Sequence, residues 1–209
     1  MAGASGLVGQ AILHVLSADD TVGTVYCVGR RSPALSHPKV RFIAVDFSDL
    51  DSLPRADEVF IALGTTIKVA GSQAAFRAVD FDAVVTVARI AKLSGARRLG
   101  VVSAMGANPR SSVFYNRVKG EMEQAVIALG YDTVVIARPS LLEGDRGALR
   151  QPPRPAERLS LALMRTLRPL VPAALRAVSA TDVARSLEEA VRTRGPGVHI
   201  LPSNQLQRR

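Results

Sequence analysis

A glycine-rich turn at the start of the chain constrains its fold more than any other feature. The stretch Gly3-Ala4-Ser5-Gly6-Leu7-Val8-Gly9 has the spacing G-x-x-G-x-x-G and leads into a helical pattern over residues 7–16. Glycines allow a tight turn and a close backbone approach, and the N–H groups of the following helix then face an anion. The loop therefore predicts a pyrophosphate site formed by Gly3, Ser5, Gly6, Leu7, Val8 and Gly9.

Short apolar runs alternate with longer helical patterns after this loop. These runs are rich in β-branched residues and lack a clean polar alternation, as in strands that are covered on both faces. The order predicts an α/β fold with a doubly wound parallel sheet, Rossmann-like in its alternation. The expected strands are residues 22–28, 40–45, 59–63, 99–103 and 133–137, and the expected helices are residues 7–16, 72–93 and 111–129.

The strand that should feed the glycine loop is truncated. A dinucleotide-binding sheet needs about five residues at this place, but only Met1 and Ala2 precede Gly3. Our hypothesis is that Met1 is a mis-assigned start and that a short apolar segment precedes it in the natural protein.

The composition changes after Ser140. Residues 144–157 contain two glycines and a Pro-Pro-Arg-Pro run, and they are followed by expected helices at 159–167 and 180–191 and a strand at 198–201. We expect a single domain over residues 1–209, in which residues 141–180 form most of a small C-terminal substrate lobe or lid.

The basic charge is concentrated in one part of the chain. The net charge is +9, yet residues 146–209 hold 12 arginines against four acidic residues, so the first 145 residues are nearly neutral. Aromatic residues make up 4% and no zinc-finger spacing occurs, so a nucleic-acid partner is not expected. Whether the C-terminal arginines attract an anionic substrate or only line a solvated surface is open.

The remaining composition indicates a soluble cytoplasmic protein. No stretch reaches the ~18 uninterrupted apolar residues of a membrane span, and the first residues lack the pattern of a signal peptide. Cys27 is the one cysteine and excludes an internal disulfide. His14, His37 and His199 follow no metal-ligand spacing, so no metal site is expected.

The residues that follow the second and third expected strands indicate which dinucleotide the chain prefers. An acidic residue after the second strand would bind a ribose 2′-hydroxyl, but this sequence has Gly29-Arg30-Arg31-Ser32. Arg30 and Arg31 fit a 2′-phosphate and predict a preference for NADP(H) over NAD(H). Asp46 and Phe47 are expected near the adenine edge. Leu63, Gly64, Thr65 and Thr66 follow the next expected strand, and we expect them to contact the cofactor as well.

A Y-x-x-x-K motif supplies candidate catalytic residues. Tyr115 and Lys119 are four residues apart in an expected helix, so they share one face. A phenol has a reference pKa near ~10, and a nearby cation favours its ionised form, which makes it useful in proton transfer. Lys119 could also hold the ribose hydroxyls of the nicotinamide. Ser103 ends the strand before this helix and could donate a hydrogen bond to a substrate carbonyl oxygen.

Together these motifs resemble those of the atypical short-chain dehydrogenases/reductases, which have an NAD(P)-binding Rossmann fold. The likeness is strongest to the Tat-interacting-protein-like small oxidoreductases and their bacterial homologues, and it runs nearly end to end. The resemblance implies that Tyr115 is the acid–base, Lys119 its activator and ribose anchor, and Ser103 the carbonyl partner. It also implies that Pro139 and Ser140 lie beside the nicotinamide, and it suggests a homodimer by analogy alone. The segments that carry it are Gly3–Gly9, 63–66, 103–107, 115–121, 138–142, 144–146 and 200–203.

These residues favour an NADPH-dependent reductase of a small carbonyl substrate, with hydride from the nicotinamide and Tyr115 as the acid–base. One alternative is a non-enzymatic NADP(H)-binding regulator or protein-interaction module on the same fold. Another is a sugar-nucleotide epimerase or dehydratase, although such enzymes usually have a larger C-terminal domain. The identity of the substrate is not encoded in any recognisable motif.

Overall fold

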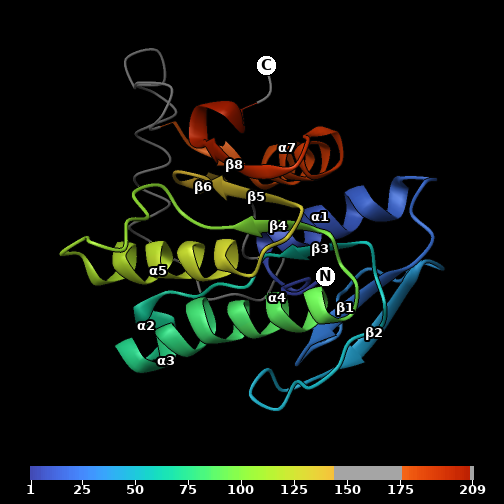
Figure 1. Cartoon of the computed structure of the whole chain (residues 1–209), viewed down its shortest axis with the longest axis horizontal. Helices are drawn as coiled ribbons and strands as arrows, with labels where there is room; N and C mark the ends of the chain where they lie inside the picture. Colours follow the sequence, from blue (N-terminus) through green and yellow to red (C-terminus); the bar gives the residue numbers. More distant parts are fainter. Residues whose placement is uncertain (144–175, 208–209) are drawn as a thin grey trace.

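The computed structural model describes residues 1–143 and 176–207 (Figure 1). The irregular stretch expected at 144–157 and the helix expected at 159–167 lie outside the described residues. Most of the expected substrate lobe at 141–180 also lies outside them, so the division of the chain into a core and a lobe stays a prediction.

A parallel sheet forms the centre of the molecule and confirms the predicted fold class. Two strands pair on one side of the sheet, and four strands pair on the other, all in parallel register. The order across the sheet is β2 (Val40–Ala44), β1 (Val25–Gly29), then β3 (Glu58–Ile61), β4 (Arg98–Val102), β5 (Thr133–Arg138) and β8 (Gly197–Pro202).

The position between β1 and β3 is held by the first residues of the chain. Ala2 forms isolated parallel bridges with Val28 on one side and with Ile61 on the other. Its amide donates to the Phe60 carbonyl at 2.9 Å, and its carbonyl accepts from the Ala62 amide at 2.9 Å. The glycine loop therefore starts from the centre of the sheet, where a doubly wound fold reverses its strand order.

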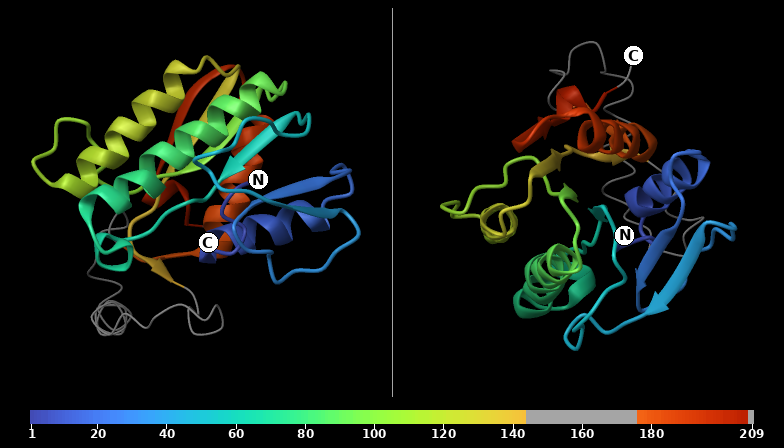
Figure 2. Two further views of the ribbon diagram at one scale, coloured as in Figure 1. Left: turned by 90° about the horizontal axis from the view of Figure 1, so that it is seen from below. Right: turned by 45° about the vertical axis from the view of Figure 1, so that its right-hand side comes forward.

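Helices cover both faces of the sheet (Figures 1 and 2). On one face, α1 (Leu7–Ala18) and α7 (Ala180–Thr193) share a buried apolar cluster that includes Leu13 and Leu187. On the other face, α4 (Val84–Leu93) and α5 (Phe114–Ala128) share a second cluster. This coverage explains why β5 reads as an unbroken apolar run, because five of its six residues are buried.

The long helix expected at 72–93 is divided in the structure. A short helix, α3 (Gln73–Arg77), passes into a π-helical turn, η1 (Ala78–Ala83), before α4 begins. A π-turn inserts one extra residue and changes which side chain faces inward. An additional single turn, α2 (Ile67–Ala70), precedes them and was not expected.

Other boundaries differ by a few residues. Helix α5 begins at Phe114 rather than at 111, because residues 108–113 form turns in which Asn108 and Ser111 side chains accept from backbone amides. The structure adds three short elements that the sequence did not predict: β6 (Leu142–Glu143), β7 (Val178–Ser179) and η3 (Ser203–Gln205). Within the described ranges, no helix is both long and apolar enough to cross a bilayer.

Candidate cofactor and active site

The glycine loop forms a tight turn against the end of β3. Gly3 has φ +88°, and a Cβ atom there would lie 2.5 Å from the Ala62 carbonyl carbon and oxygen. The Gly6 amide donates to the Gly3 carbonyl at 2.9 Å. Only glycine tolerates this backbone conformation together with so close a neighbour.

Helix α1 follows the loop with its N-terminal groups available. Gly6 is the N-cap, no side chain caps the helix, and its first turn carries no acidic residue. The helix dipole is therefore not neutralised locally, and the first amides are directed toward the loop. The turn has the backbone geometry of a phosphate cradle, and its role in binding a pyrophosphate stays a prediction.

The loop after β3 meets the buried end of the Lys119 side chain. A Cβ atom at Gly64 would lie 3.5 Å from Asp80 Oδ1 and 3.9 Å from Lys119 Nζ. Lys119 Nζ lies 2.8 Å from Asp80 Oδ1, and both side chains are at most 4% exposed. Asp80 Oδ2 accepts from the Thr65 amide at 2.8 Å. One carboxylate thus ties helix α5 to the loop that contains Gly64 and Thr65.

Tyr115 lies in the first turn of α5, where its side chain is half-buried. Its ring packs against Phe76, with centroids 5.4 Å apart and planes tilted by 39°. Phe76 is fully buried in α3. The aromatic contact limits the positions open to the phenol ring, one helical turn before Lys119.

Ser103 follows directly after β4 and is buried. Its amide donates to the Ala137 carbonyl at 2.8 Å, which holds it at the carboxyl edge of the sheet. Its hydroxyl is the notable feature, because among the described residues it has no hydrogen-bond partner although the side chain is only 6% exposed. A buried hydroxyl without a partner costs free energy unless a ligand completes it.

The segment after Ser103 is fastened to α5. The Asn108 amide donates to the Asn116 carbonyl at 3.0 Å. A Cβ atom at Gly120 would lie 2.2 Å from the Pro109 nitrogen, so α5 can approach this segment only with glycine there. These contacts join the strand end that carries Ser103 to the helix that carries Tyr115 and Lys119.

The arginine pair lies exposed at the end of β1, next to the end of β2. The Val45 amide donates to the Gly29 carbonyl at 3.1 Å, which brings the two strand ends together. Hydrogen bonds from the Ser48 amide and hydroxyl, and to a smaller degree the charge of Arg30, lower the pKa of Asp46. The Asp46 carboxylate is therefore within electrostatic reach of Arg30.

Pro139 and Ser140 have structural contacts of their own. The Pro139 carbonyl accepts from the Met105 amide at 2.9 Å. The Ser140 hydroxyl donates to the Arg176 carbonyl and accepts from the Ser203 hydroxyl at 2.8 Å. The Ser140 side chain thus joins β5 to η3, and a contact with the nicotinamide would have to be made by other atoms of this segment.

Sequence reasoning did not identify Asp80 or the pair of Glu123 and Arg138. Asp80 is an acidic residue within an otherwise apolar helical stripe, and that position was the available signal. Glu123 is buried and forms a two-bond ion pair with Arg138, which raises the pKa of that guanidinium. These two residues are 15 positions apart and share no local pattern.

A family model described as "NAD(P)H-binding" matches residues 3–160. This range holds the glycine loop, the arginine pair, Ser103, Tyr115 and Lys119. The chain belongs to the NAD(P)H-binding family. The resemblance to atypical short-chain dehydrogenases/reductases is confirmed, and the predicted dinucleotide-binding fold with it.

Several fungal proteins named FMP52 are related in sequence to this NAD(P)H-binding protein. "Protein FMP52, mitochondrial" of Coccidioides immitis is 36% identical over 160 residues, which is 69% of this chain and 65% of the relative. The protein of that name from Eremothecium gossypii is 37% identical over 147 residues, 69% of this chain and 66% of the relative. The match therefore spans slightly less than two thirds of these relatives. Their names contradict the expected cytoplasmic location, which is wrong on this comparison.

Solved structures share the fold of the NAD(P)H-binding protein at low identity. "MoeE5 in complex with UDP-glucose and NAD" has a TM-score of 0.73 and 19% identity. The match covers 96% of this chain and 73% of the MoeE5 chain. A UDP-N-acetylglucosamine 4-epimerase from Methanobrevibacter ruminantium M1 has a TM-score of 0.70 and 15% identity. The match covers 96% of this chain and 74% of the epimerase chain. These likenesses concern the fold.

The residues of the site fit an NAD(P) dinucleotide. The Gly3 turn provides a cradle that a Cβ atom would fill, and the unpartnered Ser103 hydroxyl offers a donor at the other end of the site. No group of three potential metal ligands occurs in the described part of the chain.

Proposed function

We propose that this protein is an NADPH-dependent reductase of a small carbonyl compound. The observation that carries the proposal is the buried Ser103 hydroxyl, which lacks a partner among the described residues. Ser103 lies at the end of β4, and the segment that follows β4 contacts helix α5, which contains Tyr115. A hydroxyl held in this way is preorganised to donate to a carbonyl oxygen as negative charge develops there.

The chain's own residues have separate roles in this reaction. NADPH supplies a hydride when it is bound. Ser103 holds the substrate oxygen, and Tyr115 delivers the proton that this oxygen needs. Lys119, fixed at 2.8 Å from Asp80, places a positive charge one turn from Tyr115 and close to the Gly64 loop. We assign Asp80 as a positioning residue, because it acts through Lys119.

The preference for NADPH is part of the same proposal. Arg30 and Arg31 are exposed at the carboxyl edge of the sheet and can reach a 2′-phosphate, which a guanidinium binds through two hydrogen bonds.

The test is Tyr115→Phe. NADPH oxidation is measured with a panel of aldehydes and ketones, and NADPH affinity is measured in parallel by fluorescence. Turnover should fall by roughly 10²-fold or more, since a positioned acid contributes about 10²–10⁴-fold, while affinity should change little. Phe114→Leu, one position earlier on α5, is the matched control. Full activity of Tyr115→Phe would contradict the proposed role.

A non-enzymatic NADP(H)-binding regulator is the second candidate. The observation that favours it is the ion pair of Lys119 with Asp80. The Asp80 carboxylate offsets the positive charge of Lys119 that would otherwise favour the ionised form of Tyr115. The panel separates the two candidates. Tight NADPH binding without oxidation by any carbonyl, in the parent protein as well as in Tyr115→Phe, would favour the regulator.

A further inference from the structure

Strand β8 forms one edge of the parallel sheet, and no further strand lies beyond it among the described residues (Figure 1). The Gly197 amide donates to the Asp132 carbonyl at 2.8 Å. Because successive residues of a strand direct their backbone groups to alternate sides, the odd-numbered residues of β8 bond to β5. The amides and carbonyls of Val198 and Ile200 are therefore directed outward, away from the sheet.

Prolines stand at both ends of this row of outward groups. Pro196 and Pro202 occupy the outward positions before Val198 and after Ile200, and a proline has no amide N–H. Between the prolines, two residues each offer one donor and one acceptor. We call residues 196–202 the β8 edge.

The outward residues of the β8 edge also have exposed apolar side chains. In the register of the sheet, Val198 lies beside Val134 and Ile200 beside Ile136, so all four side chains point to the same face. Val134 and Ile136 are buried in the cluster shared by α4 and α5, whereas Val198 and Ile200 are 46% and 42% exposed. Unpaired backbone groups beside exposed apolar side chains favour pairing with another strand.

The opposite edge of the sheet is protected, and the β8 edge is not. In β2, the Arg41 guanidinium donates to the carbonyls of Pro38 and Val40 at 2.7 and 3.2 Å, so a charged side chain covers the start of that edge. Charged residues on an edge strand oppose pairing with other strands. Residues 195–207, which contain the β8 edge, include no Asp, Glu, Lys or Arg.

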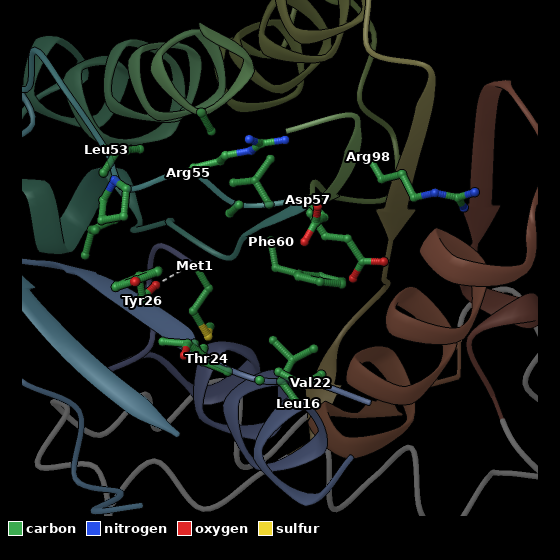
Figure 3. Close-up of a pocket in the computed structure, with 18 of the residues that line it drawn as sticks. Met1, Leu16, Val22, Thr24, Tyr26, Leu53, Arg55, Asp57, Phe60 and Arg98 are labelled. Atoms are coloured by element: carbon green, nitrogen blue, oxygen red, sulfur yellow. Dashed lines mark hydrogen bonds between the residues drawn. The ribbon is translucent and has the colours of Figure 1, made fainter. Parts of the chain in front are cut away.

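The β8 edge is held in place at its start. Arg98 Nη1 donates to the Val191 carbonyl at 2.6 Å and to the Arg194 carbonyl at 3.3 Å. Figure 3, which is centred on the cavity between β1 and β3, shows the Arg98 side chain extending from β4 toward this end of α7. The Gly195 carbonyl lies 2.9 Å from His199 Nε2. A strand that is already ordered loses little conformational entropy when it pairs.

The pattern of the β8 edge is self-complementary. When two copies pair antiparallel around a two-fold axis at His199, Val198 of each copy faces Ile200 of the other. Two residues that face each other in this way exchange both of their backbone bonds. The two pairs form four hydrogen bonds and use every outward amide of β8 in both copies. Pro196 then faces Pro202 of the other copy, so neither position leaves an amide without a partner.

The same axis brings four apolar side chains together. It runs normal to the sheet, so Val198 and Ile200 of both copies lie on one face, the face that α5 covers in each copy. Cross-strand pairs of β-branched residues stabilise antiparallel pairing. A second copy thus matches the donors, the prolines and the apolar side chains at once.

We propose that the β8 edge is a self-association surface, at which a second copy of this chain pairs antiparallel through Val198 and Ile200. The two sheets then form one continuous sheet. The interface is small, so we expect a Kd on the order of 10 µM. This inference concerns the edge of the sheet and does not depend on the proposed reaction.

The first experiment measures association by analytical ultracentrifugation from about 1 to about 500 µM, a range that brackets the expected Kd. In Val198→Lys/Ile200→Lys, like charges face each other in both pairs, and association should weaken by at least about tenfold. In Val198→Glu/Ile200→Lys, each pair joins opposite charges, and the dimer should form again. An unchanged Tm of the monomers shows that the fold is retained, because both side chains are exposed.

Phe42→Lys is the matched control for these variants. It places a lysine on the exposed apolar residue of β2, at the other edge of the sheet. It should leave the association constant of the parent protein unchanged.

The second experiment reports the register of the pair. In His199→Cys the new thiols face each other across the axis, with Cβ atoms about 4.5–5.5 Å apart, and oxidation should link the two copies after a small adjustment. Val198→Cys is the control, because position 198 faces position 200 of the other copy and should cross-link much more slowly. Cys27 is buried and does not compete.

Three results would overturn the proposal. The first is a protein that stays monomeric over the whole concentration range, and the second is a dimer that Val198→Lys/Ile200→Lys leaves unchanged. The third is slow hydrogen exchange of the Val198 and Ile200 amides in the monomer, which would assign the edge to another part of the same chain. Faster cross-linking of Val198→Cys than of His199→Cys would overturn the antiparallel register.

Discussion

At the scale of single residues, Asp80 decides the geometry of the site. Its two carboxylate oxygens face Lys119 Nζ and the Thr65 amide, each at 2.8 Å. Because Asp80 and Lys119 are both almost fully buried, neither charge is stabilised by water and each depends on the other. The same carboxylate holds the ammonium near the Gly64 loop, where a ribose is expected.

Replacing Asp80 should be costly for this reason. Asp80→Asn leaves the Lys119 ammonium buried without its counter-charge, and we expect a loss of about 3 kcal/mol in the free energy of unfolding, measured with urea. The control is Asp132→Asn, which removes an ion pair with the 78% exposed Arg97 and should cost less than about 1 kcal/mol.

A double variant tests the coupling of the pair. Adding Lys119→Met to Asp80→Asn removes the unpaired charge, so much of the lost stability should return. Similar costs for Asp80→Asn and Asp132→Asn would show that the buried pair does not have the stabilising role assigned to it.

At the scale of elements, one arginine links the ends of α1 and α7, in addition to the apolar cluster that the two helices share. Arg192, in the last turn of α7, bonds to Asp19 at the end of α1, to Thr21 at 3.2 Å and to Glu188 at 2.9 Å. Asp19 is the C-cap of α1, and its side chain also accepts from the amide and hydroxyl of Thr21 at 2.7 Å. The end of α1 is thereby linked to α7, which follows it by more than 160 residues.

This junction predicts a dependence of stability on pH. Hydrogen bonds from the Thr21 side chain and amide, with help from Arg192, lower the pKa of Asp19 to about 2. A lowered pKa means that the unfolded chain binds the proton more readily, so this contribution to stability is complete above about pH 4 and is lost as the pH falls through about 2. Chemical unfolding should show a smaller loss of stability over this range for Asp19→Asn than for the parent protein.

Asp20→Asn is the matched control, since it removes the same charge from the neighbouring exposed position. It should keep the acid dependence of the parent protein. If both variants change the pH profile equally, general charge rather than the Asp19 contacts would be responsible.

At the scale of the whole molecule, the site exists because the parallel sheet collects distant strand ends on one edge. The glycine loop follows the central position, the arginine pair follows β1, the 63–66 loop follows β3, and Ser103 follows β4. Binding at this edge would involve several elements at once. A bound dinucleotide should therefore stabilise the entire fold, because it binds only the folded state.

Cofactor preference can be measured through this stabilisation. At a concentration 100 times its Kd, NADPH should add about 2.7 kcal/mol, or a Tm increase of roughly 5–10 °C, and NADH at the same concentration should add less. In Arg30→Ala/Arg31→Ala the advantage of NADPH should disappear, since each charge-assisted bond contributes about 1.5–3 kcal/mol, equivalent to about 10–100-fold in Kd.

Arg41→Ala provides the control for this comparison. It removes an exposed arginine from β2, whose guanidinium bonds to local carbonyls, and it should keep the NADPH advantage. A stronger effect of NADH than of NADPH on the parent protein would contradict the predicted preference.

The sequence by itself determined the fold class, the order of the main strands and helices, and the glycine-rich turn that precedes the first helix. These features depend on local patterns: glycine spacing, β-branched runs and helical periodicity over about ten residues. The motif residues Ser103, Tyr115 and Lys119 were also visible, because each pattern lies within one element or at its end. The family comparison confirms the fold and the cofactor class that these patterns predicted.

Only the tertiary structure decided which groups meet. The ion pair of Asp80 with Lys119 and the burial of the Ser103 hydroxyl, which has no partner among the described residues, both depend on contacts between elements far apart in the sequence. Local propensity contains no information about such contacts, because burial and pairing are set by the packing of the complete sheet and its two helical layers.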